Sequence, residues 1–222
     1  MKAKVMIGAA MLMACSMASA QVIKVMKGET VVEVYPADQA DRIVFEETPF
    51  GQGYAKATGI GNVKWIQLWA DGPKWAECNV GAEDKKAEEY GGYFAWADNT
   101  EPTPWGSNWR MPASAELEGL LSSTNCTVEF ATQNGVNGLL CTGKGAFESN
   151  SIFLPAAGTC ENGHPVTGQG EYGFYWSSTP IDDEYDDKHA LFLQFYWESV
   201  REVNFNNRAH GCSARVVLNE SE

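Results

Sequence analysis

The acidic run DDEYDD, which begins at Asp182 and ends at Asp187, is the segment whose residue types best fit a metal site. Calcium binds six to eight oxygen ligands, and acidic loops commonly supply them. A run of like charges more often forms a loop that is only solvated. We therefore expect no resident cofactor, with calcium at this loop as the alternative.

Sulfur and imidazole ligands for zinc are scattered along the chain. Cys15 lies in the N-terminal segment, and the other five cysteines are Cys78, Cys126, Cys141, Cys160 and Cys212. They form no C-x-x-C pair, and the histidines His164, His189 and His210 are far apart in the sequence, so a zinc site has little support. An odd number of thiols outside the cytoplasm leaves at least one free or paired with another chain. Small buried side chains with one or two disulfides are expected, and their connectivity is left open.

The serines of YWSST, Ser177 and Ser178, lack the surroundings of a nucleophile. No G-x-S-x-G elbow and no nearby histidine accompanies them, and Trp176 favours a core strand whose hydroxyls bond to the backbone. Arg110 and Arg215 lie among apolar residues. They could bind an anion, but capping of backbone carbonyls or pairing with a carboxylate such as Glu116 is favoured.

One alternating pattern favours ligand binding. Leu191, Leu193 and Phe195 alternate with Phe192, Gln194 and Tyr196, and Val203 and Phe205 alternate with Glu202, Asn204 and Asn206. Two strands joined near Trp197 would bury the first set and display the second. The expected ligand-binding residues, with those at the border, are Gln194, Tyr196, Trp197, Asn204, Asn206, Arg208 and His210. Binding surfaces for proteins and glycans use this mixture, although an ordinary wet sheet face fits equally well.

The elements that position these residues are expected to be mostly strands. The 222 residues are 44% apolar and include 22 Gly, eight Trp and eight Tyr, which favours a sizeable core with short strands and tight turns. A helix is predicted from Ser114 to Ser122, where leucines repeat at helical spacing. Ala113 stands at its cap position, so only the Glu116 half of a capping box is present.

The first twenty residues predict export. Lys2 and Lys4 precede an apolar run, and Ala18-Ser19-Ala20 fits a signal-peptidase site, so residues 1–20 are interpreted as a signal peptide. The alternative is a lipid anchor on Cys15. The run is too short for a transmembrane helix, so the protein is expected in the periplasm, on the outer cell surface or outside the cell.

The net charge excludes some partners. Removing Lys2 and Lys4 from the 16 basic residues leaves 14 against 29 acidic residues, a net charge of −15. Such a surface repels nucleic acid and anionic lipid.

Three parts follow the signal peptide. Residues 21–47 alternate as a small β module, residues 48–62 are interpreted as a Gly-rich linker, and residues 63–222 form the main domain. In the main domain, strands are expected at 65–69 and 75–80 around the turn signal at 70–73, and at 91–96.

Four phrases of the main domain carry a family resemblance: NWRMPASAELEGLL from Asn108, SIFLPAAG from Ser151, GFYWSST from Gly173 and GCSARVVL from Gly211. Together they resemble the Fibrobacter-type major paralogous domain, found in exported proteins of Bacteroides-type bacteria. The resemblance covers about residues 63–218 and implies an α+β, β-rich domain with a C-type-lectin-like fold. Relatives often carry an inserted helix between the positions of Trp96 and Trp109, so the first helix of that fold is expected to be absent or displaced here.

The resemblance implies a non-catalytic binding protein that recognises a protein or glycan at the cell surface. The last third is also similar to lectin-like variable proteins that retroelements diversify. One alternative is a structural or tip subunit of a surface appendage, with residues 21–47 as its assembly element. The other is a relative of formylglycine-generating oxidases, whose copper-binding cysteine pair has no counterpart because Cys212 stands alone.

Overall fold

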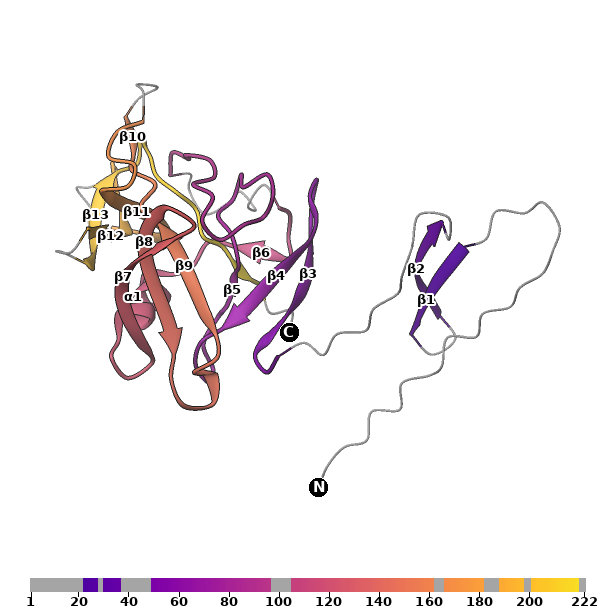
Figure 1. The fold of residues 1–222 in the computed structure, drawn as a ribbon. Coiled ribbons are helices and arrows are strands. Elements are labelled where there is room, and N and C mark those ends of the chain that lie inside the picture. The colour runs from indigo at the N-terminus through magenta and orange to yellow at the C-terminus, as the bar shows by residue number, and fades with distance from the viewer. Residues whose placement is uncertain are drawn as a thin grey trace. The chain divides into compact units, whose positions relative to one another are not determined.

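The computed structural model describes residues 22–27, 30–36, 49–96, 105–161, 166–181, 188–197 and 201–219. Several predictions therefore fall outside the described residues: the signal peptide with Cys15, the calcium loop from Asp182 to Asp187, and the part of the β module after residue 36. The chain forms two compact units, Met1–Glu47 and Thr48–Glu222 (Figure 1).

The first unit contains a hairpin in the region predicted as a β module. Strands β1 (Val22–Lys27) and β2 (Thr30–Pro36) pair antiparallel, with Val22 opposite Pro36. The register shifts between Val25 and Met26, which marks a bulge.

The described part of the second unit is β-rich with one α-helix, as the composition predicted. Its largest sheet has the order β3-β4-β5-β15-β6. The strands are β3 (Gln52–Ala57), β4 (Gly61–Gln67), β5 (Lys74–Ala76), β15 (Val217–Leu218) and β6 (Trp109–Arg110). The strand nearest the C-terminus thus lies between β5 and β6.

Three smaller antiparallel sheets complete the described part of this unit. The first is β7 (Cys126–Gln133), β8 (Val136–Gly143) and β9 (Ser151–Pro155), and a 3₁₀ turn η2 (Gly145–Phe147) joins its last two strands. The second is β11 (Tyr172–Pro180), β12 (His189–Tyr196) and β13 (Arg201–Asn207). The third pairs β10 (Cys160–Glu161) with β14 (His210–Gly211).

Helix α1 (Ser114–Leu121) begins as its sequence predicts. Ala113 is the N-cap residue, and its N–H donates to the Glu116 carboxylate at 2.7 Å, which is the expected half of a capping box. The Ser114 N–H donates to Thr179 Oγ1 of β11 at 3.0 Å. A distant hydroxyl therefore satisfies a backbone donor at the start of this helix.

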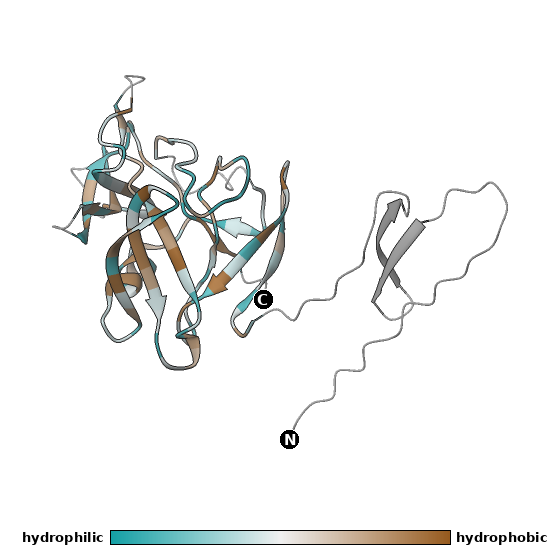
Figure 2. Cartoon of the chain, in the orientation of Figure 1, coloured by the Kyte–Doolittle hydropathy of each residue, from teal (hydrophilic) through white to brown (hydrophobic). Residues whose placement is uncertain are grey.

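Apolar residues of the sheets and the helix share a core that includes Ile66, Leu68, Trp75, Leu117, Leu120, Leu139, Leu154, Leu193 and Phe195. Figure 2 shows brown, hydrophobic stretches along the strands of this unit. The buried Arg215 bridges segments that are far apart in the sequence. Its guanidinium donates to the backbone carbonyls of Glu77 and Phe153, each at 2.9 Å, and to Asn79 Oδ1 at 2.9 Å. The prediction that Arg215 caps carbonyls is confirmed.

The linker prediction for residues 48–62 is wrong from Gln52 onward. Strand β3 occupies Gln52–Ala57 and pairs along its length with β4, so the second unit begins at Thr48 rather than at residue 63. The structure explains why glycines occur in this segment. A Cβ on Gly53 would lie 2.5 Å from the Trp65 ring, and Gly59 and Gly61 have positive φ in the β3–β4 turn.

Candidate functional site

The sheet β11-β12-β13 brings the predicted amide and tyrosine side chains to one face. Gln194 lies opposite Glu202, Phe192 opposite Asn204, and Ala190 opposite Asn206. Directly opposite residues of antiparallel strands point to the same side, so the predicted grouping of these residues on one face is confirmed. We call this side the outer face and the side of Leu193 and Phe195 the inner face.

Three half-buried aromatic rings form one end of the outer face. Tyr172 and Phe174 of β11 stack with ring centroids 5.0 Å apart, and Tyr196 of β12 lies 5.7 Å from Tyr172 and 6.0 Å from Phe174. Aromatic side chains of this kind offer apolar contact area at low entropic cost. The sequence interpretation missed Tyr172 and Phe174, although both alternate with Gly173 and Tyr175 in the same way as the residues that it selected.

The Glu202 carboxylate beside these rings accepts hydrogen bonds from two of the amide side chains. Glu202 accepts hydrogen bonds from Gln194 Nε2 at 2.7 Å and from Asn204 Nδ2 at 3.1 Å. The acceptor oxygens of Asn204 and Asn206 receive backbone N–H groups of their own strand, each at 2.8 Å. A ligand would therefore find a preorganised row of polar groups next to the three rings, with Glu202 as a member that the list of expected residues lacked.

The other end of the outer face is covered, contrary to the prediction for Phe192. This side chain is only 3% exposed and packs with Trp176, Ala190 and Cys212. The cover comes from a segment distant in the sequence, since Phe94 and Cys212 exchange backbone hydrogen bonds of 2.9 and 3.1 Å. The strand predicted at 91–96 is reduced to this isolated bridge.

Arg208 and His210 lie beyond the end of β13. The Arg208 side chain donates from Nε to the His189 carbonyl at 2.9 Å, and its guanidinium lies over the Trp96 ring at 4.3 Å. Trp96 in turn donates its backbone N–H to the Arg208 carbonyl. His210 belongs to β14 and lies opposite Glu161, so a separate small sheet holds it.

Trp197 does not border the outer face, and that placement was wrong. Its ring lies 5.8 Å from Phe130 of β7, and Phe130 also contacts Phe195 of the inner face at 6.4 Å. The Trp197 N–H donates to the Glu171 carbonyl, which continues the β11–β12 pairing. The strand alternation therefore continues through Trp197 and places it with Phe195.

Phe205 was expected to be buried and is 57% exposed. Val203, on the same face of β13, packs against the core. The cover over the inner face thus ends between these two positions, and Phe205 contacts the His189 ring at 5.7 Å.

The remaining chemical candidates have structural partners. Ser177 is buried, and its hydroxyl donates to the Leu191 carbonyl at 2.7 Å, as expected for a core strand. Burial raises the pKa of the Cys212 thiol to about 12 and the pKa values of Cys78 and Cys126 to about 11. Cys78, Cys126, Cys141 and Cys212 are free thiols in the described part of the chain. Within the described ranges, no three His, Cys, Asp or Glu side chains gather as a metal site would require.

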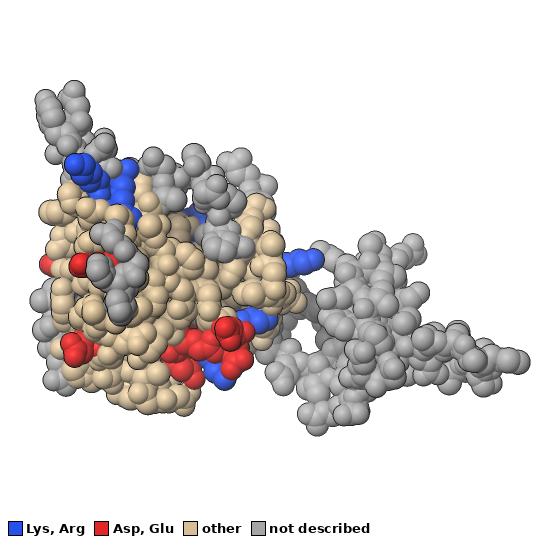
Figure 3. All heavy atoms as spheres, turned by 90° about the horizontal axis from the view of Figure 1, so that it is seen from above, with Lys and Arg blue, Asp and Glu red and all other residues tan. Residues whose placement is uncertain are grey.

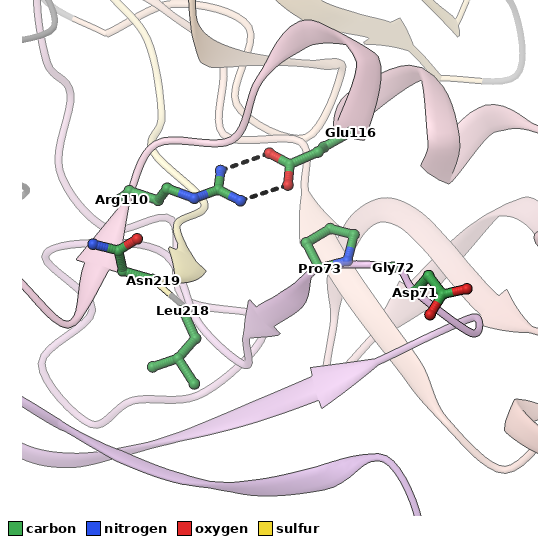
Figure 4. Close-up of a pocket in the computed structure, with 7 residues that line it drawn as sticks. All are labelled: Asp71, Gly72, Pro73, Arg110, Glu116, Leu218 and Asn219. Carbon is green, nitrogen blue, oxygen red and sulfur yellow. Dashed lines mark hydrogen bonds and ion pairs between the residues drawn. The ribbon is translucent and has the colours of Figure 1, made fainter. Parts of the chain in front are cut away.

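Arg110 lines a small pocket of about 180 Å³ with Asp71, Gly72, Pro73, Glu116, Leu218 and Asn219 (Figure 4). Its guanidinium donates to both carboxylate oxygens of Glu116, each at 2.7 Å, so the predicted pairing is confirmed. Burial raises the pKa of Glu116, but hydrogen bonds from Arg110 and the Ala113 N–H outweigh it and hold the pKa below its ordinary value. Because Glu116 already accepts these hydrogen bonds, Arg110 is a poor binding group for an anionic ligand.

The view in Figure 3 shows mostly uncharged residues, with the acidic and basic side chains in a few small groups. No helix in the described part of the chain is both long and apolar enough to cross a membrane. Comparisons with protein-family models, with curated proteins and with solved structures gave no significant match.

Proposed function

We propose that the chain is an exported, non-catalytic, C-type-lectin-like protein that binds a protein or glycan ligand at the cell surface. The binding surface is the open end of the outer face. One observation carries this proposal: the half-buried rings of Tyr172, Phe174 and Tyr196 adjoin the polar row of Gln194, Glu202 and Asn204. Partly exposed aromatics beside ordered hydrogen-bonding groups are typical of binding surfaces.

The positions of the four family phrases support the lectin-like part of the proposal. The phrase from Asn108 forms β6 and α1, the phrase from Ser151 forms β9, and the phrase from Gly173 lies in β11. The fourth supplies Cys212 and Arg215, both buried. Phrases that build the core in this way specify a scaffold, and the function depends on the surface that the scaffold presents.

The states of the thiols support a non-catalytic role. A nucleophilic or copper-binding cysteine reacts as the thiolate, which a lowered pKa favours. Burial acts in the opposite direction at Cys212. Copper-dependent oxidation of a cysteine-containing peptide by the purified chain, abolished by Cys212→Ser, would contradict this part of the proposal.

The binding test uses the purified full chain on an immobilised glycan array and on a panel of purified cell-surface proteins. The double variant Tyr172→Ala/Tyr196→Ala should lose capture by at least about tenfold, since central aromatics dominate such surfaces. Tyr54→Ala is the matched control, because Tyr54 is 65% exposed on β3, in a different sheet. Equal capture by the double variant and the control would refute binding through the outer face.

A further inference from the structure

Strand β13 is the edge of its sheet, since β12 lies on one side of it and no described strand lies on the other. One backbone hydrogen bond and the strand register show which of its groups point outward. Arg208 N–H donates to the Lys188 carbonyl, which continues the pairing of Asn206 with Ala190 and of Asn204 with Phe192. In an antiparallel pair, hydrogen-bonded residues alternate with residues whose N–H and C=O point away. The outward groups of β13 therefore belong to Val203, Phe205 and Asn207.

Two asparagine side chains accept hydrogen bonds from outward-pointing backbone N–H groups of this edge. Asn204 Oδ1 accepts from the Phe205 N–H, and Asn206 Oδ1 accepts from the Asn207 N–H, each at 2.8 Å. The other end of each amide is also held, Asn204 Nδ2 by Glu202 at 3.1 Å and Asn206 Nδ2 by Cys212 Sγ at 3.9 Å. Each asparagine thus lies across the strand, with its donor on the outer face and its acceptor over the edge.

An edge strand of this kind tends to pair with a strand of another chain. Unpaired N–H groups on an exposed strand are a template for another strand, and apolar side chains along it strengthen the tendency. Here the apolar residues Val203 and Phe205 alternate with polar residues along β13, and the Phe205 side chain is 57% exposed. We infer that Asn204 and Asn206 close the β13 edge against strand addition by a second copy of this chain. Their main role is then to prevent self-association, in addition to any contact with a ligand.

Amide hydrogen exchange of the unmodified full chain tests the caps directly. Among the described residues, no side chain accepts from the Val203 N–H, so this outward amide of the same strand is the internal reference. The amides of Phe205 and Asn207 should exchange about two- to tenfold more slowly than that of Val203 after correction for intrinsic rates, the factor expected of one net hydrogen bond. Equal corrected rates would overturn the inference without the need for any variant.

Variants test the consequence for association. Asn204→Ala should accelerate exchange at Phe205 alone, Asn206→Ala should do so at Asn207 alone, and the double variant should form dimers or larger species in light scattering at concentrations where the unmodified chain is monomeric. Gln194→Ala is the control, because it removes an amide of the outer face that does not lie on the edge. A double variant that is folded by circular dichroism and stays monomeric, or a control that associates equally, would overturn the inference.

Discussion

The two faces of the sheet β11-β12-β13 are built from the same alternating strands but are covered in different ways. On the inner face, Tyr175, Leu193 and Phe195 are fully buried in the shared core. On the outer face, Trp176 and Phe192 are buried at one end, whereas Tyr172, Phe174 and Tyr196 are half-buried at the other. Alternation therefore determines the side to which a residue points, and segments distant in the sequence determine which part of that side remains open.

The largest effect is expected at the inner face. Phe195→Ala removes a ring that stacks on Tyr175 and contacts Phe130, and the cavity should lower the free energy of unfolding by about 3–5 kcal/mol. Denaturant titration measures this loss. A loss below about 1 kcal/mol would show that the inner face is not a close-packed core.

Phe192→Ala tests the covered end of the outer face. The side chain packs edge-on against both Phe174 and Trp176, at 5.1 and 5.8 Å, so its truncation should cost about 3 kcal/mol. If the same titration gave less than about 0.5 kcal/mol, the ring would be on an open surface, as the alternation alone predicted, and the contrast between the two ends would disappear.

Tyr196 and Trp197 are neighbours at the end of β12 and lie on opposite faces of the sheet. Trp197→Ala should cost about 1–2 kcal/mol because its ring packs on Phe130, which also contacts the core. Tyr196→Ala should cost roughly half as much because the rings that it contacts are themselves half-buried. Melting temperatures of the two variants provide the comparison. The reverse order would mean that Trp197 belongs to the open surface and Tyr196 to the core.

The smallest effect is expected in the polar row. Gln194→Ala removes one hydrogen bond to the partly exposed Glu202 and should change stability by less than about 0.5 kcal/mol. A double-mutant cycle with Glu202→Gln measures the coupling between the two side chains. Coupling well above about 1 kcal/mol would show that the row is a structural network instead of an adaptable surface.

The sequence predicted local features of this domain better than it predicted which side chains are buried by segments distant in the sequence. Short-range pattern or chemistry accounts for the faces to which residues of β12 and β13 point and for the start of α1. It also accounts for the pairing of Arg110 with Glu116 and for the role of Arg215. The burial of Phe192 depends on Cys212 and on a bridge to Phe94, and no periodicity within β12 reveals either.

The linker error has a similar origin. Glycine in a strand usually weakens it and resembles a linker in composition. Gly53 is instead required because the Trp65 ring of the paired strand occupies the space of a side chain. The requirement comes from a residue on another strand, so composition alone could not distinguish it from flexibility.

The position of β15 has a consequence for how the chain folds. Val217 pairs with Trp75 on one side and with Arg110 on the other, so the five-stranded sheet remains divided until β15 is in place. Such non-local pairing slows folding, because segments far apart in the sequence must meet before the sheet is complete. A chain that lacks Val217 and Leu218 would therefore leave β6 unjoined to the sheet β3-β4-β5.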